Sequence, residues 1–277
     1  MRRHGGLIGR STRLRRLLVL GLALAAASIV SPSGATSDIV APTNETVLAA
    51  ICGRPASQDT KTCRAEDGRS AEFWYGAAFS TETGRWFTGF ATLPAPGEDP
   101  DTPNTRTVAA ATFALEDTRW RLKGVQLQVG QVGTGNRNGD APDIDEGRGA
   151  VVRAVSGGRV MMGVRLTSYG SAGSRSFAFL LLHFRETPLR WTLAGEVEAG
   201  SDESAACDEP DGDQPCQMGK SMGRLEILPE DSARPTAWPP IRVTLTGTLA
   251  GPDGKVRPAS ERDARVYRFD EASGTYR

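Results

Sequence analysis

A segment that occurs three times constrains this chain most: a phenylalanine lies seven residues before a tryptophan, and an arginine directly precedes that tryptophan. The copies cover residues 79–86, 113–120 and 184–191. We interpret each as a β-hairpin whose phenylalanine faces its tryptophan, because aromatic cross-strand pairs fix strand register. The arginine then points to the opposite face, since side chains alternate along a strand. We expect these tryptophans to be core or register residues; the alternative is a platform on which a sugar or peptide stacks.

Short strands account for most of the remaining sequence. Val160, Met162, Val164 and Leu166 alternate with their neighbours, which is typical of a half-buried strand. The expected strands are residues 73–80, 86–92, 106–115, 120–129, 151–155, 160–167, 177–184, 191–198, 224–228, 241–249 and 265–269. Many short strands separated by turns predict an all-β fold, either an antiparallel sandwich or barrel or partial propeller-like sheets built from the repeated hairpins. By the repeat, residues 72–100, 105–167 and 175–249 are possible sub-units.

One segment has helical periodicity. Thr43 or Asn44 can cap it, and Val47, Leu48 and Ile51 then share one face. We expect a single short N-terminal helix that ends near Cys52.

The N-terminus has the three parts of a secretory signal. Residues 1–16 hold six arginines and no acid, residues 17–27 are apolar, and small side chains precede a cleavage site after Ala35. The apolar run is shorter than the roughly 20 residues of a membrane-spanning helix, so a retained anchor is the lesser alternative. We expect residues 1–35 to be a signal peptide and residues 36–277 to be a periplasmic or secreted domain that is not integral to the membrane. The excess of arginine over lysine is consistent with codon bias in a GC-rich bacterial genome.

Removal of the signal makes the chain acidic. Six of the 33 Lys and Arg residues lie in the signal, whereas all 33 Asp and Glu residues remain, so the mature net charge is −6. A nucleic-acid partner is excluded on this basis, because phosphate binding needs a basic surface.

Four cysteines remain in the mature chain: Cys52, Cys63, Cys207 and Cys216. They allow three pairings, and we expect the two local bridges, Cys52–Cys63 and Cys207–Cys216, in an oxidising compartment. Zinc is the weaker alternative, because there is no Cys-x-x-Cys pair and His183 is the one histidine left in the mature chain.

The loop of residues 135–147 carries the densest set of oxygen ligands. Ca²⁺ takes several oxygens at alternating positions of a tight loop. The candidate ligands are Asn136, Asn138, Asp140, Asp143 and Asp145, with Glu146 as a further one. The alternative is a solvated acidic turn, since Gly, Asn, Asp and Pro are ordinary loop residues.

The Asn-Gly-Asp and Pro-Asp-Ile runs of this loop resemble the calcium loops of FG-GAP repeats of integrin-type propellers. The resemblance implies calcium binding, but the pattern departs from the family: position 1 is Asn136, Ala141 stands where a glycine is expected, and the downstream aspartate comes one residue early. Three hairpins are also too few for a propeller, which usually has at least four blades.

A second acidic loop, residues 201–219, contains Cys207 and Cys216. A disulfide-closed loop on a rigid scaffold is typical of a recognition surface, and its acidity can equally serve solubility.

Catalytic motifs are sparse. His183 ends the apolar run Phe179-Leu-Leu-Leu-His and is expected to be a packed or edge-strand histidine rather than a catalytic base. There is no Gly-x-Ser-x-Gly elbow, and the glycine-rich run Gly130–Gly135 precedes no helix, so a phosphate-cradling role lacks its context. Of the two tryptophans outside the repeat, Trp238 is a better candidate for an exposed aromatic than Trp74.

These observations favour a non-enzymatic, extracytoplasmic β-domain that binds a protein or glycan of the envelope or extracellular space. The alternative is a secreted hydrolase that cleaves a glycan or peptide with carboxylates of the acidic loops, since spacing in sequence does not exclude a carboxylate pair.

Overall fold

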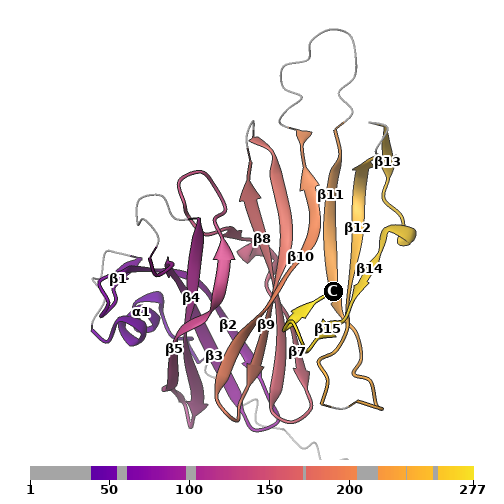
Figure 1. Cartoon of the computed structure of the whole chain (residues 1–277). Coiled ribbons are helices and arrows are strands. Elements are labelled where there is room, and N and C mark those ends of the chain that lie inside the picture. Colours follow the sequence, from indigo (N-terminus) through magenta and orange to yellow (C-terminus); the bar gives the residue numbers. More distant parts are fainter. Residues whose placement is uncertain are drawn as a thin grey trace, which may run out of the picture. The chain divides into compact units, whose positions relative to one another are not determined.

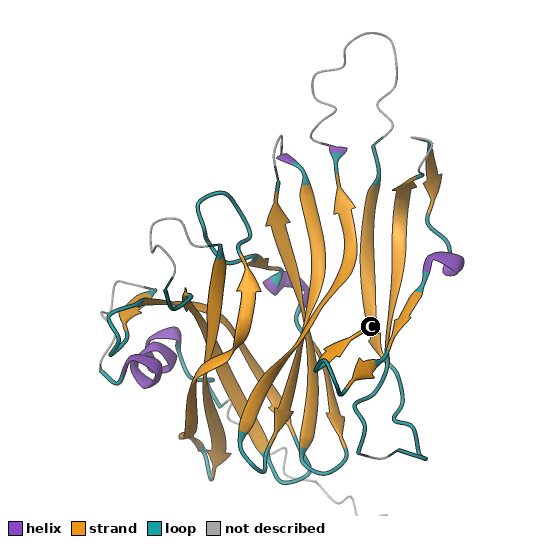
Figure 2. Cartoon of the chain, viewed as in Figure 1, coloured by secondary structure: helices purple, strands orange, loops and turns teal. Residues whose placement is uncertain are grey.

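Antiparallel strands form most of the protein, as the alternating sequence predicts (Figure 2). The computed structural model describes residues 39–54, 61–97, 104–170, 173–204, 218–234, 236–251 and 255–277. The expected signal peptide, residues 1–35, lies outside these ranges and stays a prediction. The described residues all belong to one compact unit, Ile39–Arg277.

The first sheet contains five strands in sequence order, each antiparallel to its neighbour (Figure 1). They are β1 (Thr62–Arg64), β2 (Ser70–Ser80), β3 (Arg85–Pro94), β4 (Thr105–Glu116) and β5 (Arg119–Gly133).

The second sheet begins with β6 (Asp143–Ile144) and β7 (Val151–Val155), which both pair with β8 (Arg159–Tyr169). It continues through β9 (Arg175–Arg185), β10 (Arg190–Asp202), β11 (Lys220–Ile227) and β12 (Ile241–Ala250), which pairs with β13 (Val256–Pro258) and β14 (Arg265–Tyr267). A separate hairpin of β15 (Phe269–Asp270) and β16 (Thr275–Tyr276) follows. Two short 3-10 turns are η1 (Glu146–Arg148) and η4 (Glu261–Asp263).

The two sheets pack face to face around one core cluster. Phe90 and Val108 of the first sheet meet Val164 and Leu180 of the second in it. A second cluster covers the other face of β8 and β9 with residues of β11 and β12. Most of β8 is therefore buried on both sides, so the expectation of a half-buried strand is wrong there. This is a sandwich; the barrel alternative is wrong, because β11 pairs with β10 at a single position, Asp202–Lys220, and no ladder joins β11 to β7 in the described part of the chain.

The predicted helix is confirmed as α1 (Asn44–Cys52). Thr43 caps its first turn, and Gly53 ends it in the left-handed conformation that glycine adopts without strain. Val47 and Leu48 are fully buried against the outer face of the first sheet. Gly89 of β3 permits this approach, because a Cβ atom there would lie 2.3 Å from a methyl carbon of Val47.

All three repeats form β-hairpins, and the predicted Phe–Trp pairing is confirmed in two of them. Phe79 faces Trp86, and Phe184 faces Trp191. In the second repeat the pairing of Phe113 with Trp120 is wrong: Trp120 faces Leu115, because Glu116 pairs with Arg119 and leaves a turn of only two residues, where the other hairpins have four. Asp117 in this turn has φ 57°, as tight hairpin turns require. Trp120 therefore packs beside α1, with its ring centroid 6.1 Å from that of Phe87.

The first and third hairpins lie in different sheets and meet through their aromatic rings. Ring centroids are 5.1 Å apart for Phe79 and Phe184, 5.4 Å for Phe79 and Trp191, and 5.3 Å for Phe90 and Trp191. The Trp191 indole N–H donates across the interface to Thr88 Oγ1 at 3.0 Å. The tryptophans of these hairpins are thus core residues, as expected.

Replacing Thr88 with valine tests the interface hydrogen bond. Thr88 is fully buried, so T88V leaves the Trp191 N–H without a partner and should lower the free energy of unfolding by about 1–3 kcal/mol. T246V is the matched control, because Thr246 is exposed and donates to the Met222 carbonyl at 3.0 Å. Urea unfolding compares the two, and an equal loss in both variants would contradict the role of Thr88.

Candidate functional site

The loop of residues 135–147 connects the two sheets and is folded on itself. Asn136 Oδ1 accepts the backbone N–H groups of Asn138 at 2.9 Å and Asp140 at 3.2 Å. Asn136 Nδ2 donates to Asp140 Oδ2 at 3.0 Å. The backbone N–H of Tyr169 donates to the Gly135 carbonyl at 2.6 Å, so the loop is fastened to the end of β8.

The candidate calcium ligands of this loop separate into groups. Asn136, Asp140 and Asp143 line one cleft, whereas Asp145 faces the arginines 148 and 165 at N–O distances of 3.1 and 4.0 Å. The Glu146 side chain lies outside the described part of the structure. Within the described ranges no three His, Cys, Asp or Glu side chains are grouped so that they could hold a metal ion. Calcium binding by this loop stays a prediction of the sequence.

The cleft has a volume of about 510 Å³ and is formed by the start of α1, by β2 and β3, and by the loop. It is lined by Asn44, Lys61, Glu72, Phe73, Trp74, Thr92, Asn136, Asp140, Ala141, Pro142, Asp143 and Ile144. We call it the Trp74 cleft. It combines one tryptophan with three carboxylates, two amides and a hydroxyl, and a concave site with convergent polar groups is the usual form of a ligand site.

A β-bulge places Trp74 in this cleft. The pairing of β2 with β3 shifts between Phe73 and Tyr75, so Trp74 is the extra residue of the bulge. Bulges re-aim side chains, and here both Phe73 and Trp74 remain half-buried at successive positions. The Trp74 indole N–H donates to the Pro142 carbonyl at 2.8 Å, which ties the loop to β2.

The positive charge of Arg106 partly balances the carboxylates of the cleft. Burial lowers the pKa of Arg106 on β4, while the charges of Glu72 and Asp140 act in the opposite direction. The Arg106 Nε atom is buried and has no hydrogen-bond partner among the described residues. A hydrogen bond with Asp143, followed by burial, raises the pKa of Tyr169 beside the loop.

Sequence reasoning placed Asn136, Asp140 and Asp143 in one loop but missed Glu72 and Trp74. A signal for them exists: Phe73, Trp74 and Tyr75 are three consecutive aromatics, which breaks the two-residue period of a strand and indicates a bulge.

His183 is not at a cleft. It is buried in β9, its ring is stacked on that of Trp238 with centroids 3.6 Å apart, and Nε2 lies 3.3 Å from the Tyr276 hydroxyl. Burial, and then the charges of Arg185 and Arg159, lower the pKa of His183 to about 3. The expectation of a packed histidine is confirmed. The preference for Trp238 as an exposed aromatic is wrong, because its ring is covered by His183 on one side and approached by Arg159 and Arg185.

One of the two expected disulfides is present. Cys52 at the end of α1 is bonded to Cys63 of β1, which joins the helix to the first sheet. Cys207 and Cys216, with most of the second acidic loop, lie outside the described residues. At the described end of that loop, hydrogen bonds from Ser204 and then Lys220 lower the pKa of Asp202 to about 2.

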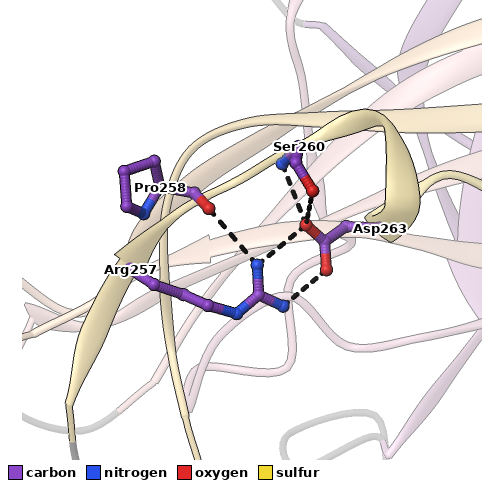
Figure 3. A network of polar contacts seen from close by, with 4 residues as sticks. All are labelled: Arg257, Pro258, Ser260 and Asp263. Atoms are coloured by element: carbon purple, nitrogen blue, oxygen red, sulfur yellow. Dashed lines mark hydrogen bonds and ion pairs between the residues drawn. The ribbon is translucent and has the colours of Figure 1, made fainter.

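A polar network lies beside η4 (Figure 3). The Arg257 guanidinium contacts both carboxylate oxygens of Asp263, at 2.9 and 2.5 Å, and donates to the Pro258 carbonyl at 3.2 Å. The Ser260 backbone N–H and hydroxyl both donate to Asp263 Oδ2 at 2.9 Å. These bonds hold the pKa of Asp263 well below its usual range, with the Arg257 bond the largest cause. Because Asp263 is occupied by its own neighbours, we interpret the network as a structural clamp.

The sequence matches no protein-family model and no curated protein, so no relative supplies a function. None of the helices in the described ranges is both long and apolar enough to cross a membrane.

The W74F variant tests the anchor of the loop. Phenylalanine keeps an aromatic ring but lacks the N–H that bonds Pro142, so we expect a loss of about 1 kcal/mol in unfolding free energy and faster proteolytic cleavage within residues 135–147. W120F is the control, since Trp120 Nε1 has no hydrogen-bond partner among the described residues. Equal cleavage of both variants would contradict the anchoring role.

His183 predicts a pH-dependent stability. The native state keeps the ring neutral down to about pH 3, whereas the unfolded chain takes up a proton near pH 6.5. The contribution is therefore complete above pH 6.5 and is lost as the pH falls toward 3, at about 1.4 kcal/mol per pH unit. Urea unfolding between pH 7 and 5 should show this slope in the wild type and not in H183Q. If the slope is the same in both proteins, His183 is not its source.

Proposed function

We propose that the mature chain is an extracytoplasmic, non-enzymatic binding domain whose Trp74 cleft binds a glycan of the envelope or extracellular space. The observation that carries this proposal is the half-buried Trp74 on the wall of a cleft with Glu72, Asp140 and Asp143. The Cys52–Cys63 disulfide and the secretory pattern of residues 1–35 support the compartment.

The chemistry of the lining favours a ligand rich in hydroxyl groups. Carboxylates accept hydrogen bonds, amides accept and donate them, and a tryptophan ring offers an apolar surface to a sugar face. Lys61 is the one basic side chain that lines the cleft among the described residues, so an anionic ligand is disfavoured there. A basic peptide would meet the same carboxylates, which makes protein binding an outcome that the experiment must separate.

The hydrolase alternative uses the same residues. Three carboxylates line one cleft, and glycoside hydrolysis needs two of them on opposite sides of the scissile bond. A binding domain leaves the glycan intact, whereas a hydrolase releases new reducing ends.

The test is a binding screen of the mature protein against envelope polysaccharide fractions, a glycan array and envelope proteins. We expect W74A and D140N to weaken glycan binding about tenfold or more. E226Q should leave binding unchanged, because Glu226 is an exposed carboxylate paired with Arg242 on the outer strands. Equal binding by W74A, or binding to proteins alone, would overturn the proposal. Release of reducing ends that D140N abolishes would favour the hydrolase.

A further inference from the structure

The edge of β11 that faces β7 and β8 is held by arginine side chains. Arg153 of β7 donates to the Ile227 carbonyl at 2.7 Å, and Arg165 of β8 donates to the Gly223 carbonyl. No backbone ladder joins β7 to β11 among the described residues. We call this contact zone the arginine seam.

Arg165 is the more unusual of these arginines. Its side chain is 7% exposed, and its guanidinium carbon lies 5.0 Å from the ring centroid of Phe179. Its carboxylate neighbour, Asp145, is 4.0 Å from Nε and at the same time 3.1 Å from Nε of Arg148, so two cations share one carboxylate. The Arg165 Nη1 atom is buried and without a hydrogen-bond partner among the described residues.

This arrangement leaves the charge of Arg165 only partly balanced and its Nη1 donor without a partner among the described residues. A buried donor without a partner destabilises the folded state, and more so when it is charged. Burial, and then the charge of Arg148, lower the pKa of Arg165. An anion placed beside the guanidinium would relieve both costs.

A cavity of about 540 Å³ lies at this seam. It is lined by Arg148, Gly149, Val151, Arg165, Phe179, Met222, Gly223, Arg224, Leu225 and Thr246. Arginines occupy part of the wall, and Val151, Phe179, Met222 and Leu225 give it an apolar part. Asp145 does not line it, so the charged side chains that do are all arginines within the described part of the chain.

We propose that the seam cavity binds a small monocarboxylate with a hydrocarbon tail, whose carboxylate pairs with Arg165 and whose tail packs on the apolar wall. A planar guanidinium matches a planar carboxylate and can bind it through two parallel hydrogen bonds. Because Nη1 is covered, the guanidinium must rotate toward the cavity to make this pair. Its contact with Asp145 is long, at 4.0 Å, so a closer contact with the ligand carboxylate can replace it. Arg148, with a side chain 56% exposed at the rim, adds a second positive charge.

Calorimetric titration of the mature protein with octanoate tests the site. Octanoate should bind, 1-octanol should bind about tenfold or more weakly because it lacks the charge, and inorganic phosphate should not compete with octanoate. R165M should weaken octanoate binding about tenfold or more, since methionine keeps an apolar fill without the donors. R148Q should weaken it about threefold, and R190Q should not change it, because Arg190 is exposed beside the β9–β10 turn and does not line the cavity.

Several outcomes would overturn the proposal: no octanoate binding, equal affinity for octanoate and 1-octanol, displacement of octanoate by phosphate, or unchanged affinity in R165M. If circular dichroism shows that R165M does not fold, R148Q decides, because Arg148 is exposed; unchanged affinity in R148Q then counts against the site. The site is independent of the Trp74 cleft, so W74A should bind octanoate like the wild type, and failure of either proposal can be told from failure of the other.

Discussion

Trp191 makes the contact on which the arrangement of the two sheets depends. Its ring lies among Phe79, Phe90 and Phe184, and its indole N–H reaches Thr88 in the opposite sheet. Its backbone is held as well: Gln126 Oε1 on β5 accepts the Trp191 N–H at 2.6 Å, and Gln126 Nε2 donates to the Trp191 carbonyl at 3.2 Å. A side-chain amide thus takes the place of a backbone ladder between β5 and β10. Trp191 thus joins the two sheets both through packing and through hydrogen bonds.

The loop of residues 135–147 contacts residues of both candidate sites. The loop of residues 135–147 leaves β5 in the first sheet and enters β6 in the second, so its course is set by the sandwich. One part of it, through Pro142 and Asp143, closes the Trp74 cleft. Further along, Asp145 of the loop and Arg148 just after it reach the arginine seam. The first part of the loop therefore lies among carboxylates, and Asp145 near its end lies among arginines.

The sequence predicts those features that depend on neighbouring residues. The position of β8, the caps of α1 and the Cys52–Cys63 bridge are local, and each was predictable. The burial of β8 on both faces was not, because β11 and β12, which cover its second face, lie far along the chain. Register was predictable only where turn length was the same: Phe113 and Trp120 match the other repeats in spacing, but a two-residue turn moves their pairing. The burial of Trp238 was not predictable, because its partner His183 is far away in sequence and is itself packed against the β15–β16 hairpin. For the same reason the sequence predicted cleft residues that lie within one loop and missed those that β2 contributes.

The arginine seam follows from the way the second sheet ends its pairing. After Asp202–Lys220 the strands β10 and β11 separate, and β11 packs on the outer face of the central strands. Beyond that pair, no ladder joins this edge of β11 in the part of the chain that the structure describes. An open edge invites pairing with another chain, and charged side chains directed at it are a common protection. Arg153 and Arg165 provide such protection by bonding to two of its carbonyls. A guanidinium that binds a carbonyl uses only some of its five N–H donors, so others remain for a further acceptor. A cavity with cationic and apolar walls is then a physical consequence of closing a sheet edge with arginine instead of a further strand.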